Sequence, residues 1–304
     1  MADAISICEP VFLWEAHPEW RTEQGRPSIT PYLLPRRADG TPRPAILVIP
    51  GGGYGCVCTS TEGGPIARGF NELGYNCFVL DYRCGKFGQY PDIFADAKRA
   101  VKLIRARADQ FGIAADQVYS CGFSAGGHLA GALGTDFCDD IDVSCGDAAD
   151  AQSGRVNAML LGYPVTTGDK AVGHDGTLKN CWGIPFDGTE PTLKQVRYFA
   201  LCNHIDEQTA PAFIWHTMAD QIVPVEGSFE FAAALKKAGI ICSLHIFPFG
   251  DHGMLRAIGT DAGVWQAMAD AFLQKLVERK HLSADEFHAQ YTNDEQGRRV
   301  GAWA

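Results

Sequence analysis

The chain has 304 residues, of which 46% are hydrophobic and 20% are charged. These fractions are typical of globular proteins and exclude a disordered or collagen-like chain. The net charge of −10 argues against a nucleic-acid partner, because a surface that binds nucleic acid has to neutralise phosphates. No apolar stretch reaches the roughly 18 residues that a membrane-spanning helix needs, so we expect no membrane protein.

The first residues and the cysteines bear on the cellular setting. The first 20 residues lack the basic start and apolar core of a secretory signal, which predicts a cytoplasmic protein. The 11 cysteines lack the spacing of a disulfide framework, so we expect free thiols that pack as small hydrophobes. Cys56 and Cys58 are the only close pair, and no second pair or nearby histidine completes a zinc site. The sequence therefore predicts no bound metal.

Short apolar runs alternate with helical patterns from residue 45 onward. This alternation is typical of a mostly parallel sheet with helices on both faces, so the predicted fold class is α/β, and we expect residues 1–304 to form one domain. In the clearest helix, apolar residues recur at three- and four-residue steps, from Ile93 through Ala97 and Val101. In chain order, the expected elements are strand 45–49, helix 65–73, strand 76–81, helix 92–110, strand 117–121, helix 125–133, strands 156–161 and 212–216, helix 225–238, strand 241–247 and helix 261–278.

Residues 134–154 form a long connection with six aspartates and no lysine or arginine. We expect a solvated acidic loop. A calcium-binding loop that starts at Asp140 is the alternative, but its sixth position is Cys145 instead of glycine and its twelfth is Ala151 instead of glutamate. The calcium interpretation is therefore set aside.

Two further segments lie outside the predicted sheet and its helices. Residues 163–211 are too long for a simple turn, and their bulky side chains suggest a segment that covers a pocket and shapes substrate choice. These side chains are Trp182, Pro185, Phe186 and Phe199. Residues 280–304 are polar with few apolar anchors, and we expect a loosely packed tail.

A candidate nucleophile lies at the end of the predicted strand 117–121. The chain continues into Gly122-Phe123-Ser124-Ala125-Gly126 and then a helical pattern, which is the Gly-x-Ser-x-Gly motif in its strand-to-helix context. Glycines at both flanks leave room for neighbouring chains at such a sharp turn. The serine would project from the top of the sheet at the positive end of a helix. A glycine-rich structural turn is the alternative, and the flanking elements favour a nucleophilic Ser124.

A serine nucleophile needs an imidazole as its base and a carboxylate to orient that imidazole. In the order Ser, Asp, His, the loops after strands 212–216 and 241–247 supply Asp220 and His252. His216 and Asp251 compete for these roles, but His216 lies within a strand and Asp251 adjoins His252. His128, one helical turn beyond the serine, is expected to pack structurally. We therefore predict the triad Ser124, Asp220 and His252.

The anionic intermediate of acyl transfer needs backbone amides as donors. The strand 45–49 runs into Pro50-Gly51-Gly52-Gly53-Tyr54-Gly55, where missing side chains let amides approach a ligand. We predict an oxyanion hole formed by the amides of Gly52, Gly53 and Ala125. A phosphate-binding loop is the alternative, but neither glycine-rich phosphate fingerprint is matched.

Together, these residues resemble a known family. The ordered set of motifs is similar to the esterase/lipase branch of the α/β-hydrolase superfamily, and within it to the acetyl-esterase-like, BD-FAE-type carbohydrate esterases, some of which are labelled xylanases. The resemblance implies an α/β-hydrolase fold and hydrolysis of short acyl esters, including acetylated sugars, without a metal or organic cofactor. The substrate would be a small-molecule or oligosaccharide ester. The motifs are Pro50-Gly51-Gly52-Gly53-Tyr54, Asp81-Tyr82-Arg83, Gly122 to Ala130, Tyr163-Pro164, His216-Thr217 with Asp220, and His252-Gly253.

Other residues and functions stay open at this stage. Glu62 and Arg83 also match the family pattern and are expected to pair structurally near the site, while Tyr54 and Trp182 are candidate pocket walls or simple packing. The same scaffold could cleave an aryl formamide or a peptide, and a receptor without catalysis is a further alternative. The acyl length, the alcohol and the oligomeric state do not follow from the sequence.

Overall fold

The computed structural model describes residues 5–280. The chain up to Gln266 forms one compact unit, and a second unit starts at Ala267, within the last helix. The sheet and the predicted site residues all belong to the first unit. The predicted tail 280–304 lies outside the described residues, except for the helical Lys280.

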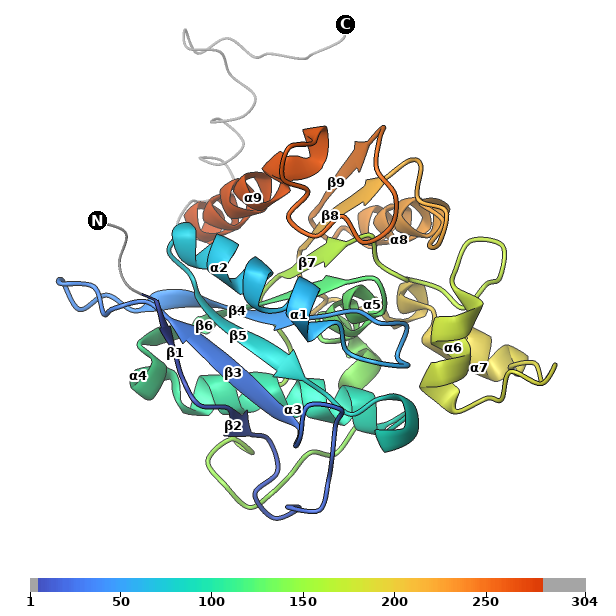
Figure 1. Cartoon of the computed structure of the whole chain (residues 1–304). Helices are drawn as coiled ribbons and strands as arrows, with labels where there is room; N and C mark the ends of the chain where they lie inside the picture. The colour runs from blue at the N-terminus through green and yellow to red at the C-terminus, as the bar shows by residue number, and fades with distance from the viewer. Residues whose placement is uncertain (1–4, 281–304) are drawn as a thin grey trace, which may run out of the picture. The chain divides into compact units, whose positions relative to one another are not determined.

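Within residues 5–280, nine strands form a single sheet (Figure 1). Its order is β1-β3-β5-β4-β6-β7-β8-β9, and β2 pairs with β3. In this order, each pair of neighbouring strands from β5 to β9 is parallel. Strand β3, on the other side of β5, runs antiparallel to it. The strands are β1 (Ser6–Ile7), β2 (Val11–Phe12), β3 (Ser28–Leu33), β4 (Arg43–Ile49), β5 (Asn76–Asp81), β6 (Ile113–Phe123), β7 (Met159–Gly162), β8 (Ala212–Thr217) and β9 (Cys242–Phe247).

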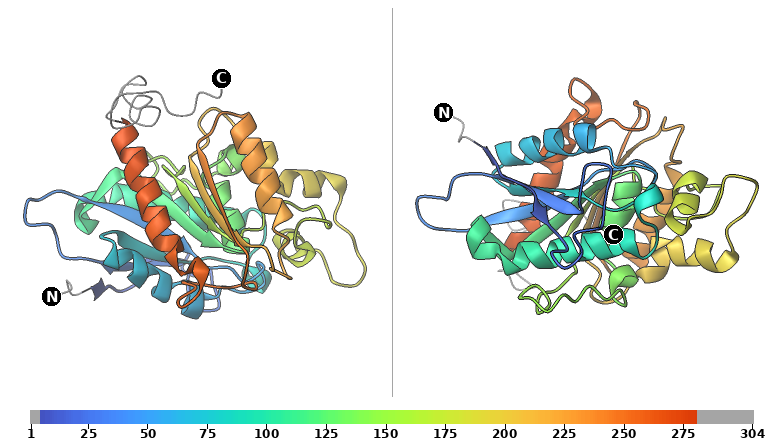
Figure 2. Two further views of the ribbon diagram at one scale, coloured as in Figure 1. Left: turned by 90° about the horizontal axis from the view of Figure 1, so that it is seen from above. Right: turned by 60° about the horizontal axis from the view of Figure 1, so that its bottom comes forward.

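Helices cover both faces of this sheet. Helix α2 packs on β5 on one face, and α3 packs on β6 on the other, as the right view of Figure 2 shows. Because both faces are buried, the central strands are continuous apolar runs without alternation. The helices are α1 (Thr59–Glu62), α2 (Gly64–Glu72), α3 (Asp92–Ala106), α4 (Ala108–Phe111), α5 (Ala125–Ala132), α6 (Asp175–Trp182), α7 (Leu193–Phe199), α8 (Glu226–Lys237) and α9 (Trp265–Lys280). The predicted α/β-hydrolase fold class is confirmed.

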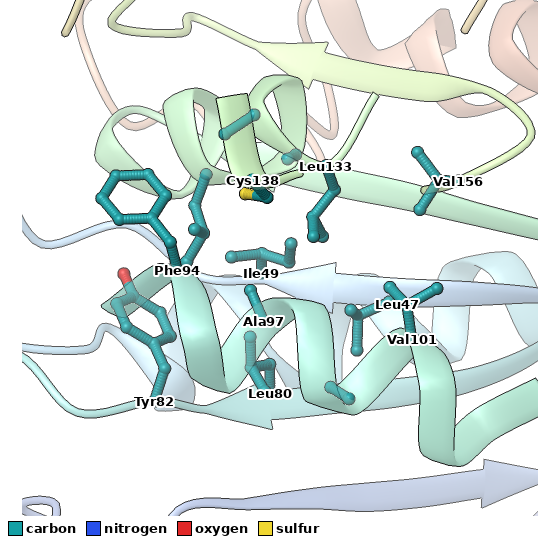
Figure 3. Close-up of a cluster of buried hydrophobic side chains, with 14 of the residues drawn as sticks. Leu47, Ile49, Leu80, Tyr82, Phe94, Ala97, Val101, Leu133, Cys138 and Val156 are labelled. Carbon is teal, nitrogen blue, oxygen red and sulfur yellow. The ribbon is translucent and has the colours of Figure 1, made fainter. Parts of the chain in front are cut away.

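The main core lies between the sheet and helix α3 (Figure 3). Leu47 and Leu80 from the strands meet Ala97 and Val101 of α3, and all four side chains are fully buried. Each large aliphatic side chain buried in this way stabilises the fold by about 1.5–3 kcal/mol. The core thereby holds α3 firmly against β4, β5 and β6.

Several element boundaries differ from the sequence expectation. The helix expected over residues 92–110 ends at Ala106, and α4 follows as a separate turn that is capped by Gly112 in the left-handed region, with φ 64°. Strand β7 starts three residues later than expected, at Met159. The strands β1–β3 were not predicted, because two of them have only two residues and β3 contains Pro31.

Four of the six aspartates in the acidic loop 134–154 are exposed to solvent, and basic side chains from outside the loop bind several of its residues. Arg99 of α3 pairs with Asp147 and Asp150. Lys98 of the same helix donates to the carbonyl oxygens of Cys138, Asp139 and Ile141, at 2.8–2.9 Å. The basic residues that pair with the loop's aspartates lie outside it, and they include Arg99 of α3 and Arg155, which binds Asp139.

The connection 163–211 contains helices α6 and α7. Phe199 is fully buried in the core, whereas Phe186 is 67% exposed, so the two aromatic side chains do not form one roof. Helix α7 starts with a capping box in which Thr192 and Gln195 bond each other's backbone amides. That Thr-x-x-Gln pattern is the local signal by which α7 could have been found.

Candidate active site

Ser124 occupies a strained turn between β6 and α5. Its backbone has φ 53° and ψ −121°, a conformation that non-glycine residues rarely adopt. A β-carbon on Gly122 would lie 2.0 Å from the carbonyl oxygen of Gly126, and one on Gly126 would lie 2.2 Å from that of Ile49. Only glycine fits at either flank, as the sequence predicts, and the turn is packed directly against the end of β4.

The structure brings the three predicted triad side chains together. His252 Nε2 lies 2.9 Å from Ser124 Oγ, and His252 Nδ1 lies 2.7 Å from Asp220 Oδ2. Ser124 follows β6, Asp220 follows β8 and His252 follows β9, and the carboxyl ends of these parallel strands share one edge of the sheet. Because a carboxylate only accepts, the neutral imidazole carries its hydrogen on Nδ1 and presents Nε2 as an acceptor to the serine hydroxyl.

Asp220 is held by four hydrogen bonds. Its Oδ1 accepts from the amides of Ile222 and Val223, each at 2.9 Å, and its Oδ2 accepts from His252 and from His216 Nε2 at 3.0 Å. Burial alone would raise the pKa of Asp220, but these hydrogen bonds outweigh it and hold the pKa well below its usual range. The carboxylate is therefore ionised and fixed in orientation.

The other two histidines considered for the site, His216 and His128, are both held in buried hydrogen bonds. His216 is fully buried, and its Nε2 lies 3.1 Å from the carbonyl oxygen of Val223, so that nitrogen carries the hydrogen and donates toward Asp220. His128 is also fully buried, with Nδ1 2.9 Å from Tyr54 Oη and Nε2 2.8 Å from the carbonyl oxygen of Phe199. Burial lowers the pKa of His128 to about 3, so it is neutral. Tyr54 is buried in this contact and is not a pocket wall.

The glycine loop after β4 lies against the serine turn. A β-carbon on Gly51 would lie 3.0 Å from Ser124 Cβ. The carbonyl oxygen of Gly51 accepts from Cys58 N at 3.0 Å, and that of Gly52 accepts from Gly55 N at 3.0 Å. Because carbonyl and N–H point in opposite directions across a trans peptide, the amides of Gly52 and Gly53 point away from the loop interior. The Ala125 amide is the first of α5 and has no intrahelical acceptor. Among the described residues, none of the three predicted donor amides has a hydrogen-bond acceptor within the protein.

Glu62 links the glycine loop to the histidine loop. Its Oε2 accepts from Gly51 N at 2.6 Å, and its Oε1 accepts from Tyr163 Oη at 2.8 Å. Tyr163 Oη in turn accepts from Leu255 N at 3.3 Å, three residues beyond His252. Burial raises the pKa of Glu62, although both hydrogen bonds oppose the shift. Glu62 and Tyr163 are far apart in the chain and meet only in the fold. The sequence pattern therefore identified Glu62 but not Tyr163 as its partner.

Arg83, the other family-pattern residue, lies outside this network. Its guanidinium binds the buried carboxylate of Asp96 at 2.8 Å and that of Asp92 at 3.1 Å. It also stacks over Trp20, 3.9 Å from the ring centroid. These contacts join α3 to the N-terminal segment, so Arg83 supports the fold beside the catalytic edge.

His174 is a site residue that the sequence analysis missed. It caps α6, where its Nδ1 accepts from Thr177 N at 3.1 Å, so the neutral ring carries its hydrogen on Nε2. Burial and the nearby His252 lower the pKa of His174 and keep it neutral. A β-carbon on Gly53 would lie 3.9 Å from His174 Cε1. The ring therefore places a hydrogen-bond donor beside the glycine loop, and no local pattern in the sequence marks it.

Among residues 5–280, no group of three or more His, Cys, Asp and Glu side chains is placed to hold a metal ion. Within that part of the chain, no helix combines the length and apolarity of a bilayer span.

Comparison with known proteins decides the family. The BD-FAE family profile matches residues 32–235, about two thirds of the chain. The chain belongs to the BD-FAE family. The crystal structure of an acetyl ester-xyloside bifunctional hydrolase from Caldicellulosiruptor lactoaceticus shares 33% identity with this BD-FAE protein at a TM-score of 0.78, covering 88% of this chain and 96% of that one. The predicted family resemblance is thus confirmed.

Curated relatives of this BD-FAE chain carry names from xylan breakdown. Endo-1,4-beta-xylanase B of Butyrivibrio fibrisolvens is 37% identical over 75% of this chain and 34% of its own length. Acetylxylan esterase of Xylanibacter ruminicola is 30% identical over 80% of this chain and 46% of its own length. The BD-FAE chain therefore spans between a third and a half of the length of these relatives.

Proposed function

We propose that this BD-FAE protein is a serine esterase that hydrolyses short acyl esters, with acetyl groups on sugar hydroxyls as its main substrates. The observation that supports this proposal most directly is the hydrogen-bonded series Ser124–His252–Asp220, with distances of 2.9 and 2.7 Å. It lies beside backbone amides that have no acceptor within the protein. The names of two relatives support an acetyl group on a sugar as the substrate: one is an acetylxylan esterase, and another is an acetyl ester-xyloside bifunctional hydrolase.

The mechanism begins with attack by Ser124 Oγ on the ester carbonyl. His252 Nε2 takes the hydroxyl proton as the bond forms, and Asp220 stabilises the resulting imidazolium through Nδ1–H. The negative oxygen of the tetrahedral intermediate is bound by the amides of Gly52, Gly53 and Ala125. Every group in this step belongs to the chain itself.

The second half of the reaction releases the acyl group. His252 returns its proton to the leaving alkoxide, and an acyl-enzyme on Ser124 remains. A water molecule then attacks with His252 as base, and collapse of the second intermediate frees the carboxylic acid. The Glu62–Tyr163 link joins the glycine loop to the histidine loop throughout, so donors and base keep their separation.

Substitution of Ser124 tests the proposal. Ser124→Ala removes the nucleophile without adding volume, and we expect hydrolysis of p-nitrophenyl acetate to fall by about 10⁶-fold in kcat. The exposed loop variant Ser153→Ala is the matched control and should keep wild-type rates. A folded Ser124→Ala protein that retains most of its activity would exclude the assignment.

A substrate panel tests the acyl and alcohol preference. We expect rates to fall from acetyl to octanoyl esters, and acetylated xylo-oligosaccharides to be deacetylated. N-formylkynurenine and proline peptides serve as comparison substrates for formamidase and peptidase activity. Faster turnover of either than of acetyl esters would contradict the proposed substrate class.

A further inference from the structure

A separate cavity lies between the C-terminal end of α6 and the first turns of α7. Its volume is about 310 Å³, and it is lined by Tyr90, Trp182, Lys194, Gln195 and Tyr198. Sites for small ligands start at about this size and combine aromatic walls with a few polar groups. None of the five residues takes part in the proposed acyl transfer, so the cavity needs a different explanation.

Three aromatic rings form a preorganised wall of this cavity. The centroids of Tyr90 and Trp182 are 4.6 Å apart with planes at 44°, and Tyr198 meets Tyr90 edge-on at 5.5 Å. Tyr90 Oη donates to Tyr198 Oη at 3.1 Å, which ties two of the rings together. Each of the three side chains is half-buried, so part of it is accessible. Rigid aromatic side chains of this kind provide contact area at little entropic cost.

Hydrogen-bond donors without a partner in the described protein line the same cavity. Gln195 Oε1 is occupied by the amide and hydroxyl of Thr192, which leaves the Nε2 hydrogens of Gln195 free among the described contacts. Within residues 5–280, the exposed Lys194 has no carboxylate partner. The cavity thus offers aromatic faces and hydrogen-bond donors with a single positive charge. A pyranose ring matches this set, because its C–H face packs on aromatic rings and its hydroxyl oxygens accept hydrogen bonds.

Helix α6 connects this cavity to the catalytic edge. Asn180 Nδ2 donates to the carbonyl oxygen of Gly53 at 2.9 Å, so α6 contacts the glycine loop directly. Trp182 follows two residues later, and Tyr90 N donates to the carbonyl oxygen of Cys181 at 2.7 Å. Trp182 thus lies at the opposite end of α6 from the cap residue His174, about 12 Å further along the helix at about 1.5 Å per residue.

We propose that this cavity is a sugar-binding subsite, which holds one pyranose ring of an acylated oligosaccharide while another ring of the same chain presents its ester to Ser124. The inference rests on the proposed esterase function and deepens it by naming where the carbohydrate binds. It predicts that cavity residues affect oligosaccharide substrates and leave small esters unaffected.

Paired kinetics test the subsite. Trp182→Ala and Tyr198→Ala should each raise KM for acetylated xylo-oligosaccharides about 10-fold, since truncating a central aromatic contact costs at least that factor. Their kcat/KM for p-nitrophenyl acetate should stay within two-fold of wild type, which also shows that the variants are folded. Phe186→Ala is the matched control, because Phe186 lies on the same insertion but is exposed outside the cavity. This variant should leave the kinetic constants for both substrates unchanged.

A binding measurement complements the kinetics. Lys194→Ala alters an exposed position and leaves the core intact, so it tests the cavity even if an aromatic variant fails to fold. Isothermal titration of Ser124→Ala protein with unacetylated xylo-oligosaccharides should show binding that weakens several-fold when Lys194→Ala or Tyr198→Ala is added. Unchanged binding and unchanged oligosaccharide KM would overturn the subsite. Failure of the wild-type protein to hydrolyse p-nitrophenyl acetate would instead overturn the esterase proposal.

Discussion

The carboxylate of Asp220 shows how single residues set the chemistry of the site. Two backbone amides from its own turn and two imidazoles share its oxygens, at 2.7–3.0 Å. The amides fix the carboxylate plane, and the His252 contact fixes which ring nitrogen carries the hydrogen. His216 adds a second imidazole donor from within β8. His252 presents its Nε2 to Ser124 because the carboxylate of Asp220, which holds its Nδ1, cannot rotate.

Replacing this carboxylate should impair catalysis without unfolding the protein. Asp220→Asn keeps the shape but can donate to His252 Nδ1, which favours the wrong tautomer, so we expect kcat for p-nitrophenyl acetate to fall about 10⁴-fold. Asp251→Asn is the matched control, since Asp251 adjoins His252 but accepts only backbone amides. Comparable losses in both variants would mean that Asp220 has no special role.

At the scale of elements, the sheet edge and helix α6 assemble the site from distant parts of the chain. The three predicted triad residues follow strands β6, β8 and β9, strand β4 leads into the glycine loop, and Asn180 of α6 packs against that loop. Figure 1 shows α6 beyond α5, next to the loop that follows β4. The insertion between β7 and β8 therefore contacts the glycine loop of the candidate site.

The start of α6 offers a stability test of this arrangement. His174→Ala removes the cap that accepts from Thr177 N and should lower the free energy of unfolding by about 1 kcal/mol. His174→Asn supplies a capping oxygen and should stay close to wild type. Urea denaturation of both variants measures the difference, and equal stability of Ala and Asn would show that the cap contributes nothing.

Sequence patterns predicted the parts of the site that are local. The strand, Gly-x-Ser-x-Gly and helix around Ser124 are contiguous, and Asp220 and His252 each follow an apolar strand. His174 and the partner of Glu62 were not predicted, because their roles depend on contacts across the fold. For Tyr54 the sequence left a pocket wall and simple packing open, and the structure shows packing, because the glycine-rich loop turns this residue inward, with φ 57°, into the core.

At the scale of the first unit, His128 joins three segments beneath the site. It lies on α5, contacts Tyr54 of the glycine loop, and stacks on Phe199 at the end of α7 with centroids 3.9 Å apart. Burial lowers its pKa to about 3, while an unfolded histidine titrates near 6.5. As the pH falls below about 6.5, His128 therefore takes up a proton in the unfolded state but stays neutral in the folded state.

This linkage predicts acid sensitivity of the fold. Stability from the neutral His128 is fully present above about pH 6.5 and declines toward pH 3, with a loss of roughly 2 kcal/mol between pH 7 and pH 5. His128→Gln keeps hydrogen-bonding groups but does not titrate, so its unfolding free energy should vary less over that range. Urea titrations at each pH measure this, with the half-buried surface variant His17→Gln as control. Identical pH slopes in wild type and His128→Gln would contradict the assignment.

The most direct test of the central claim is to locate the covalent adduct that a serine-directed phosphonate leaves on the intact protein. Digestion and mass spectrometry should find one adduct, on Ser124, and none in Ser124→Ala. A protein that stays unlabelled, or that carries the adduct on a residue other than Ser124, would contradict acyl transfer through this serine.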